Sequence, residues 1–91
     1  MTYQTPQFMA DLLRKVQDLQ LVIARKNDGH SLHVDLNSIE NHFFGPDYNI
    51  MFSVALLDDA GFVKLWYFSS TEDADVLDHT LKDLAFEIIR L

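Results

Sequence analysis

Two apolar segments, residues 48–57 and 62–69, are joined by the polar sequence DDAG at positions 58–61 and constrain the fold more than any other feature. Asp at the first position and Gly at the fourth suit a type I turn followed by a bulge, so the segments predict a β-hairpin. This turn places Asp58 opposite Phe62 and divides the side chains between two faces. One face carries Ile50, Phe52, Val54, Leu56, Trp66 and Phe68, and the other carries Met51, Ser53, Ala55, Leu57, Val63, Leu65 and Tyr67. Neither face is polar, so we expect each face to be buried against other elements of the chain or against another molecule.

Residues 6–19 predict an amphipathic helix. Thr5 suits the N-cap, and Pro6 occupies the first helical position, where proline is favoured. The apolar side chains recur at helical spacing and fall within about 140° of a helical wheel. They are Phe8, Met9, Leu12, Leu13, Val16 and Leu19.

The apolar period changes after this helix. The apolar triplet at 21–23 leads into the sequence NDG at 27–29, and residues 31–36 then alternate between polar and apolar side chains. Asp-Gly between two apolar runs is a strong hairpin signal. We therefore expect a first hairpin with one strand on each side of this turn.

Capping patterns predict two further helices. Asn37 with Glu40 resembles a capping box, and a Gly-Pro stop signal follows, so residues 39–44 predict a short helix. Ser70 with Asp73 shows the same capping pattern ahead of a C-terminal helix. The apolar stripe of that helix consists of Leu77, Leu81, Leu84, Ile88 and Leu91.

Together these elements predict an α+β fold in a single domain, residues 1–91. The order is α-β-β-α-β-β-α, and consecutive hairpins imply a four-stranded antiparallel sheet with the N-terminal and C-terminal helices on one face. Either the short helix covers the other face with Phe43 and Phe44, or that face forms a homodimer or partner interface. The candidate residues of such a dimer face are Met51, Ala55, Leu57, Leu65 and Tyr67.

The chain is acidic, and its charge is regional. The formal net charge is −7, and no lysine or arginine occurs between Lys26 and Lys64. Nucleic-acid binding requires clustered lysine and arginine, so we expect no direct nucleic-acid contact and expect a basic protein surface as the partner. The sequence has no cysteine, no leader-like N-terminus and no apolar run long enough for a bilayer, so we expect a cytoplasmic protein without membrane contact.

The C-terminal helix carries the candidate partner-binding residues. The helix dipole explains part of its acidity, because carboxylates are favoured near a helix N-terminus. Phe86 instead falls about 180° from the centre of the apolar stripe, among charged residues, which is typical of interface anchors. The candidate surface consists of Glu72, Asp75, Asp78, Asp83, Phe86 and Glu87. We predict a non-enzymatic interaction module, such as an inhibitor, adaptor or chaperone, and in a sharper form a phage-type nucleic-acid mimic.

Two other functions stay open. One is a small enzyme or ligand-binding domain built on His42, Asp47 and Tyr48, because histidine titrates near neutral pH and loops carry much catalysis. The other is a structural subunit of a larger assembly. No histidine spacing matches a metal motif, and no phosphate loop or nucleophile motif is present, so we predict no catalytic residue, metal or cofactor.

The predicted element order and the acidic charge resemble those of the small acidic homodimeric chaperones of bacterial type III secretion. The likeness is one of architecture and charge and involves no shared motif. Such a likeness leaves the function to be argued from the site itself.

Overall fold

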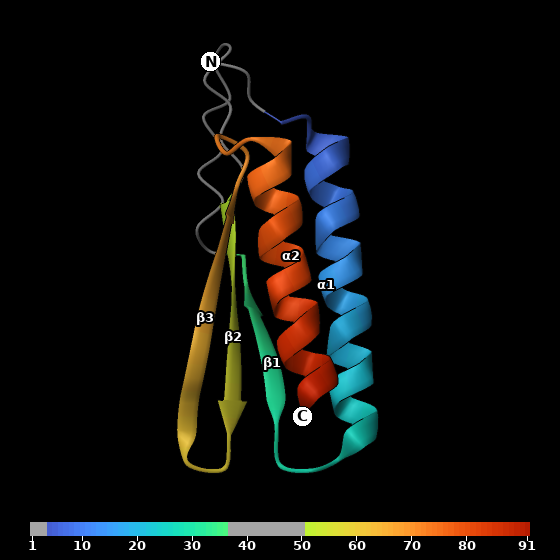
Figure 1. The fold of residues 1–91 in the computed structure, drawn as a ribbon, viewed down its shortest axis with the longest axis vertical. Helices are drawn as coiled ribbons and strands as arrows, with labels where there is room; N and C mark the ends of the chain where they lie inside the picture. Colours follow the sequence, from blue (N-terminus) through green and yellow to red (C-terminus); the bar gives the residue numbers. More distant parts are fainter. Residues whose placement is uncertain (1–3, 37–50) are drawn as a thin grey trace.

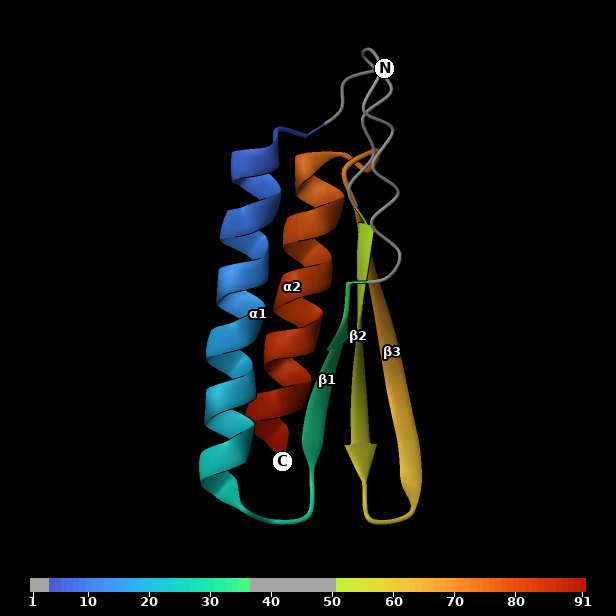
Figure 2. The same cartoon turned by 180° about the vertical axis from the view of Figure 1, so that it is seen from behind.

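Figure 1 shows the fold in a computed structural model, which describes residues 4–36 and 51–91. Two helices and three strands follow one another in the order α1 (Pro6–Lys26), β1 (Ser31–Asp35), β2 (Met51–Asp58), β3 (Gly61–Ser69) and α2 (Ala74–Arg90). The strands form an antiparallel sheet in the order β1-β2-β3. Both helices lie on one face of this sheet (Figures 1 and 2). The predicted α+β class and antiparallel sheet are confirmed.

The predicted fourth strand is absent from residues 4–36 and 51–91, where the order is α-β-β-β-α. The expected strand at 21–23 forms part of α1 instead. Two other predictions, the short helix at 39–44 and the start of the second hairpin at 48–50, lie outside the described residues.

Helix α1 continues past the expected strand because the helical period of burial continues. Ile23 is buried in line with Val16, while Leu21 and Val22 are exposed. A short apolar run is compatible with either a strand or a buried helical turn, and periodicity alone does not separate them. Packing of one side of the run against the core favours the helix.

The sequence NDG ends α1 instead of turning a hairpin. Asn27 has a left-handed conformation with φ 49°, which is common just after a helix. Gly29 follows with φ 90°, and a Cβ atom added there would lie 2.6 Å from Asp59 Oδ2. The α1–β1 connection and the β2–β3 turn are therefore neighbours at one end of the molecule (Figure 1).

The two helices begin differently. In α1, the Thr5 hydroxyl accepts a hydrogen bond of 3.1 Å from the backbone N–H of Phe8, which confirms the predicted N-cap. Helix α2 has Asp73 as its N-cap, without a side-chain capping bond. The predicted capping box is wrong because α2 begins at Ala74, so that Asp73 and not Ser70 is the N-cap. Ser70 is buried in the turn before α2, and its carbonyl accepts the N–H of Gln4 at 2.8 Å.

The pairing of β2 with β3 confirms the predicted division into two faces. Asp58 pairs with Gly61 and not, as predicted, with Phe62. A bulge after Leu56 then shifts the pairing by one residue, so Leu56 lies opposite Lys64, as the predicted alternation requires. The inward side chains of the hairpin are Phe52, Val54, Leu56, Trp66 and Phe68, and all are buried.

The core lies between this inward face and the two helices. The Phe52 and Phe68 rings stack with their centroids 4.8 Å apart. From the helices, the core receives Met9, Leu12, Val16, Ile23, Leu77, Leu81, Leu84 and Ile88. The predicted apolar stripes are thereby confirmed, except that Leu91 is exposed at the C-terminal end of α2.

Candidate interaction surface

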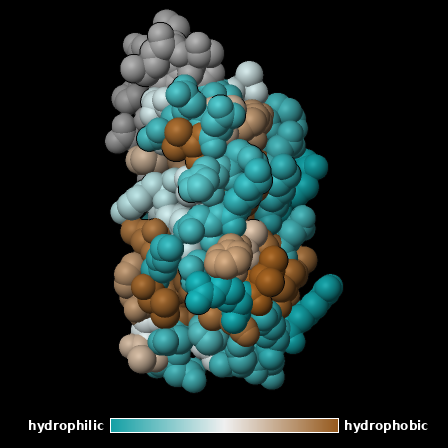
Figure 3. All heavy atoms as spheres, viewed as in Figure 1, coloured by the Kyte–Doolittle hydropathy of each residue, from teal (hydrophilic) through white to brown (hydrophobic). Residues whose placement is uncertain are grey.

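The two most exposed large apolar side chains on α2 are near its C-terminal end. Phe86 is 58% exposed and Ile89 is 73% exposed. The guanidinium carbon of Arg90 lies 5.4 Å from the centroid of the Phe86 ring, within cation–π range. Figure 3 shows hydrophobic residues gathered over the lower part of α2, next to hydrophilic ones. Phe86 thus points away from the core, as helical spacing predicts.

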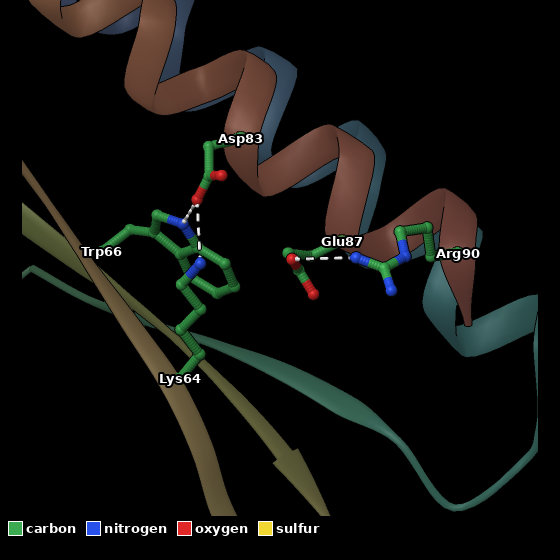
Figure 4. Close-up of polar contacts among 5 residues, drawn as sticks. All are labelled: Lys64, Trp66, Asp83, Glu87 and Arg90. Carbon is green, nitrogen blue, oxygen red and sulfur yellow. Dashed lines mark hydrogen bonds and ion pairs between the residues drawn. The ribbon is translucent and has the colours of Figure 1, made fainter.

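Asp83 links α2 to the edge strand β3. Its Oδ2 atom accepts hydrogen bonds from Trp66 Nε1 at 2.8 Å and from Lys64 Nζ at 3.0 Å (Figure 4). The hydrogen bond from Trp66, and then the one from Lys64, lower the pKa of Asp83. Lys64 Nζ also lies 5.3 Å from the centroid of the Trp66 ring. Asp83 is one of the predicted partner-binding residues, and its carboxylate is bonded within the domain.

Two more of the predicted carboxylates have partners on α2 itself. Asp78 Oδ2 lies 2.9 Å from Lys82 Nζ, and the hydrogen bond from Lys82 lowers the pKa of Asp78. Glu87 Oε1 lies 3.8 Å from Arg90 Nη1 (Figure 4). The Asp78–Lys82 pair is exposed and the Glu87 carboxylate is partly exposed, and ion pairs at the surface are weak and screened by salt.

The predicted carboxylates do not lie on one flank of α2. Asp83 faces β3, whereas helical spacing places Asp78 about 140° away from Asp83 around α2. Helical spacing places Asp75 and Phe86 between these flanks, on the solvent side. Glu72 precedes the helix, and among residues 4–36 and 51–91 neither its carboxylate nor that of Asp75 has a bonding partner.

The hairpin side chains that point away from the helices form a second surface, here termed the outer face. It comprises Met51, Ser53, Ala55, Leu57, Phe62, Val63, Leu65 and Tyr67. Tyr67 is 63% exposed, and Phe62, which pairs with Leu57 next to the turn, is 64% exposed. All five residues predicted for a dimer face lie on this outer face.

An open hollow of about 560 Å³ lies between the last turns of α1 and β1. It is lined by Gln20, Leu21, Ile23, Ala24, Asn27, Gly29, His30, Ser31 and Leu32. At its rim, His30 Nδ1 lies 3.0 Å from Asp28 Oδ1, and this hydrogen bond lowers the pKa of Asp28. No sequence pattern indicates this hollow, because the predicted helix ends before it.

No group of three or more histidine, aspartate or glutamate residues within 4–36 and 51–91 is placed to hold a metal ion. The alternative catalytic residues His42, Asp47 and Tyr48 lie outside the described residues. Of the two helices in the described part of the chain, neither is long and apolar enough to cross a bilayer.

Comparison with known proteins adds no identity. No protein family, no curated protein and no solved structure matches the chain.

Proposed function

We propose that the protein is a non-enzymatic interaction module that binds a basic protein surface through the solvent side of α2. Phe86 and Ile89 supply the apolar anchors, and Asp75 supplies a carboxylate on the same side. The exposure of Phe86 among charged residues is the observation that carries the proposal. Aromatic side chains of this kind supply much of the binding energy at protein interfaces, and a surrounding polar rim excludes water.

The ion pairs on α2 refine the electrostatic part of the proposal. Lys82 and Arg90 neutralise Asp78 and Glu87 in the free protein. Because such pairs are weak in water, a partner's guanidinium group can replace Lys82 or Arg90 when it binds. Asp78 and Glu87 are therefore available to pair with a bound partner, although each has an ion-pair partner in the free protein.

The same ion pairs favour a protein partner over the nucleic-acid-mimic form of the prediction. A mimic of DNA requires uninterrupted rows of negative charge that resemble the phosphate backbone. On this molecule, Lys64, Lys82 and Arg90 stand among the carboxylates. We therefore propose that the protein docks on a basic protein. The identity of that partner decides whether the module acts as an inhibitor, an adaptor or a chaperone.

Peptide display tests the proposal even though the partner is unidentified. Random peptides selected on the immobilised full chain at about 0.05 M salt are expected to be rich in arginine and lysine, with an aromatic or aliphatic residue to meet Phe86. Raising the salt to about 0.5 M is expected to weaken their binding about tenfold, because screening reduces the electrostatic attraction.

Phe86→Lys provides the decisive variant because it removes the anchor and adds a repelling charge. The selected peptides are expected to bind it about tenfold or more weakly than the wild type, which corresponds to about 1.4 kcal/mol. Tyr67→Lys is the matched control, because Tyr67 is similarly exposed but lies on the outer face of the sheet. Equal binding to the two variants, or binding that is insensitive to salt, would contradict the proposal.

A further inference from the structure

The outer face of the β2–β3 hairpin is an apolar surface separate from the solvent side of α2. Tyr67, Phe62 and Val63 are 63%, 64% and 48% exposed, and Met51, Ala55, Leu57 and Leu65 are partly buried. The helices cannot cover these side chains, because both helices lie on the other face of the sheet (Figures 1 and 2). The largest exposed apolar patch of a soluble protein is often an interaction site.

The charge of the outer face distinguishes it from the rest of the molecule. The chain has a net charge of −7, yet none of the hairpin residues of the outer face carries a charged side chain; on the same side of the sheet, β1 adds His33 opposite Ala55 and Asp35 opposite Ser53. The nearest lysine, Lys64, extends to the opposite side of the sheet, where it bonds Asp83. A basic partner gains little electrostatically on such a surface, whereas two acidic copies can approach each other most closely where carboxylates are few.

We propose that the outer face of the hairpin is the contact surface between two copies of this chain, related by a twofold axis. In such an isologous contact the same patch serves both copies. The same neutral apolar patch on two copies can be in contact without charge repulsion. Its burial stabilises the dimer through the hydrophobic effect, while the acidic surfaces stay in solvent. This interaction is independent of the partner proposed for α2.

The edges of the sheet are less suited to pairing than the outer face. Along β1, the side-chain amide of Gln20 from α1 donates a hydrogen bond of 2.9 Å to the carbonyl of Leu32, so α1 covers part of that edge. On β3, a bulge leaves Val63 without an opposite residue, and Lys64 lies on the same edge strand. Bulges and lysines are two common devices that prevent edge-to-edge pairing.

The size of the outer face sets the expected affinity. Two strands of about eight residues, at about 4.8 Å between strands and 3.4 Å per residue, present about 260 Å². That is about a third of the 800 Å² that each partner contributes to a standard interface. We therefore expect a reversible dimer with a Kd on the order of 1–100 µM instead of an obligate one.

Sedimentation equilibrium of the full chain from about 1 to 500 µM tests this proposal. A monomer–dimer equilibrium is expected, and the dimer should strengthen a few-fold between about 0.05 and 0.5 M salt, because salt screens the repulsion between two acidic copies. The basic partner of α2 is expected to respond to salt in the opposite sense. A chain that stays monomeric up to about 500 µM would overturn the proposal.

Tyr67→Lys places a charge in the centre of the proposed contact and is expected to raise the dimer Kd about tenfold or more. Phe86→Lys is the matched control, with the same kind of change at a similarly exposed ring on α2, and it should leave the Kd unchanged. Both variants change the net charge by the same amount, so overall charge repulsion cannot explain a difference between them. Val63→Lys repeats the test at the bulge, and circular dichroism checks that each variant is folded.

The reverse pattern would place the contact elsewhere. If Phe86→Lys abolished the dimer while Tyr67→Lys and Val63→Lys left it intact, the contact would lie on α2 and the outer-face proposal would be wrong.

Discussion

The two faces of the β2–β3 hairpin are both apolar, but only one of them is buried. Phe68, on the inner face, is fully buried, whereas its chain neighbour Tyr67, on the outer face, is 63% exposed. Alternation along a strand sends neighbouring side chains to opposite faces, so adjacent residues of similar size have opposite surroundings. Apolarity alone therefore does not decide which face becomes the core.

The position of the helices determines which face of the hairpin becomes the core. Helices α1 and α2 run side by side on the inner face, and their buried rows meet the hairpin there. The hydrophobic effect has no direction, so an apolar face that the chain's own helices leave bare is available to another molecule. The inner face therefore accounts for folding, and we assign the outer face to association.

The largest expected contrast between the faces is in stability. Phe68→Ala removes a fully buried ring that stacks on Phe52 and should lower the free energy of unfolding by about 3–5 kcal/mol. Tyr67→Ala should lower it by less than about 0.5 kcal/mol at concentrations where the chain is monomeric. Urea unfolding of both variants measures the difference, and similar losses would show that the outer face also belongs to the core.

The second prediction concerns the turn that sets which residues reach each face. Gly61 has φ 116° with no atom within 4 Å of an added Cβ, so Gly61→Ala should destabilise the fold through backbone strain alone. The expected loss is about 1–3 kcal/mol in urea unfolding. Gly29→Ala, outside the hairpin but also at positive φ, should show a loss of the same order, because only the movable Asp59 carboxylate meets its Cβ.

An unchanged stability of Gly61→Ala would mean that the turn is not the one described. The register that separates the two faces would then be in doubt, because a slip of one residue exchanges the faces of a strand.

A smaller effect is expected at the bond between the hairpin and α2. Bonding to Trp66 and Lys64 lowers the pKa of Asp83 below its usual value of 3.8. The charged form of Asp83 therefore stabilises the fold above about pH 4, and this stabilisation is lost as the pH falls through the lowered pKa. Asp83→Asn should be less stable than the wild type at pH 7, and the difference should shrink below about pH 3.

Urea unfolding at both pH values measures this change, with Asp18→Asn as the control. Asp18 is exposed on α1 and has no ion pair within residues 4–36 and 51–91, so its substitution should have little effect at either pH. A stability difference between Asp83→Asn and the wild type that does not vary with pH would exclude a role for the Asp83 charge.

Much of the fold could be predicted because the relevant signals are local. The Thr5 cap, the β2–β3 turn and the apolar stripe of α2 each depend on residues close in sequence, and the structure contains all three. The strand expected at 21–23 is wrong because tertiary packing extends α1 through an ambiguous apolar run. The sequence NDG then serves as a helix end and not as a hairpin turn.

In the candidate site too, local sequence patterns predict some features, and tertiary packing determines the others. Helical spacing alone is sufficient to place Phe86 outside the core. The bond from Trp66 to Asp83 joins residues 17 positions apart, and no local pattern indicates it. The sequence predicts one surface for the acidic residues of α2, but the bonds of Asp83 to Trp66 and Lys64 depend on how α2 packs beside β3.

Methyl NMR spectra of the chain at increasing concentration test the central claim most directly, because one experiment observes both faces of the hairpin. The methyl groups of Leu57 and Leu65, on the outer face, are expected to shift as the dimer forms, while those of Leu56 and Val54, in the core, stay unchanged. If the outer-face methyl groups stay constant up to about 500 µM, or if Ile89 on α2 shifts in their place, the outer face does not bind a second copy.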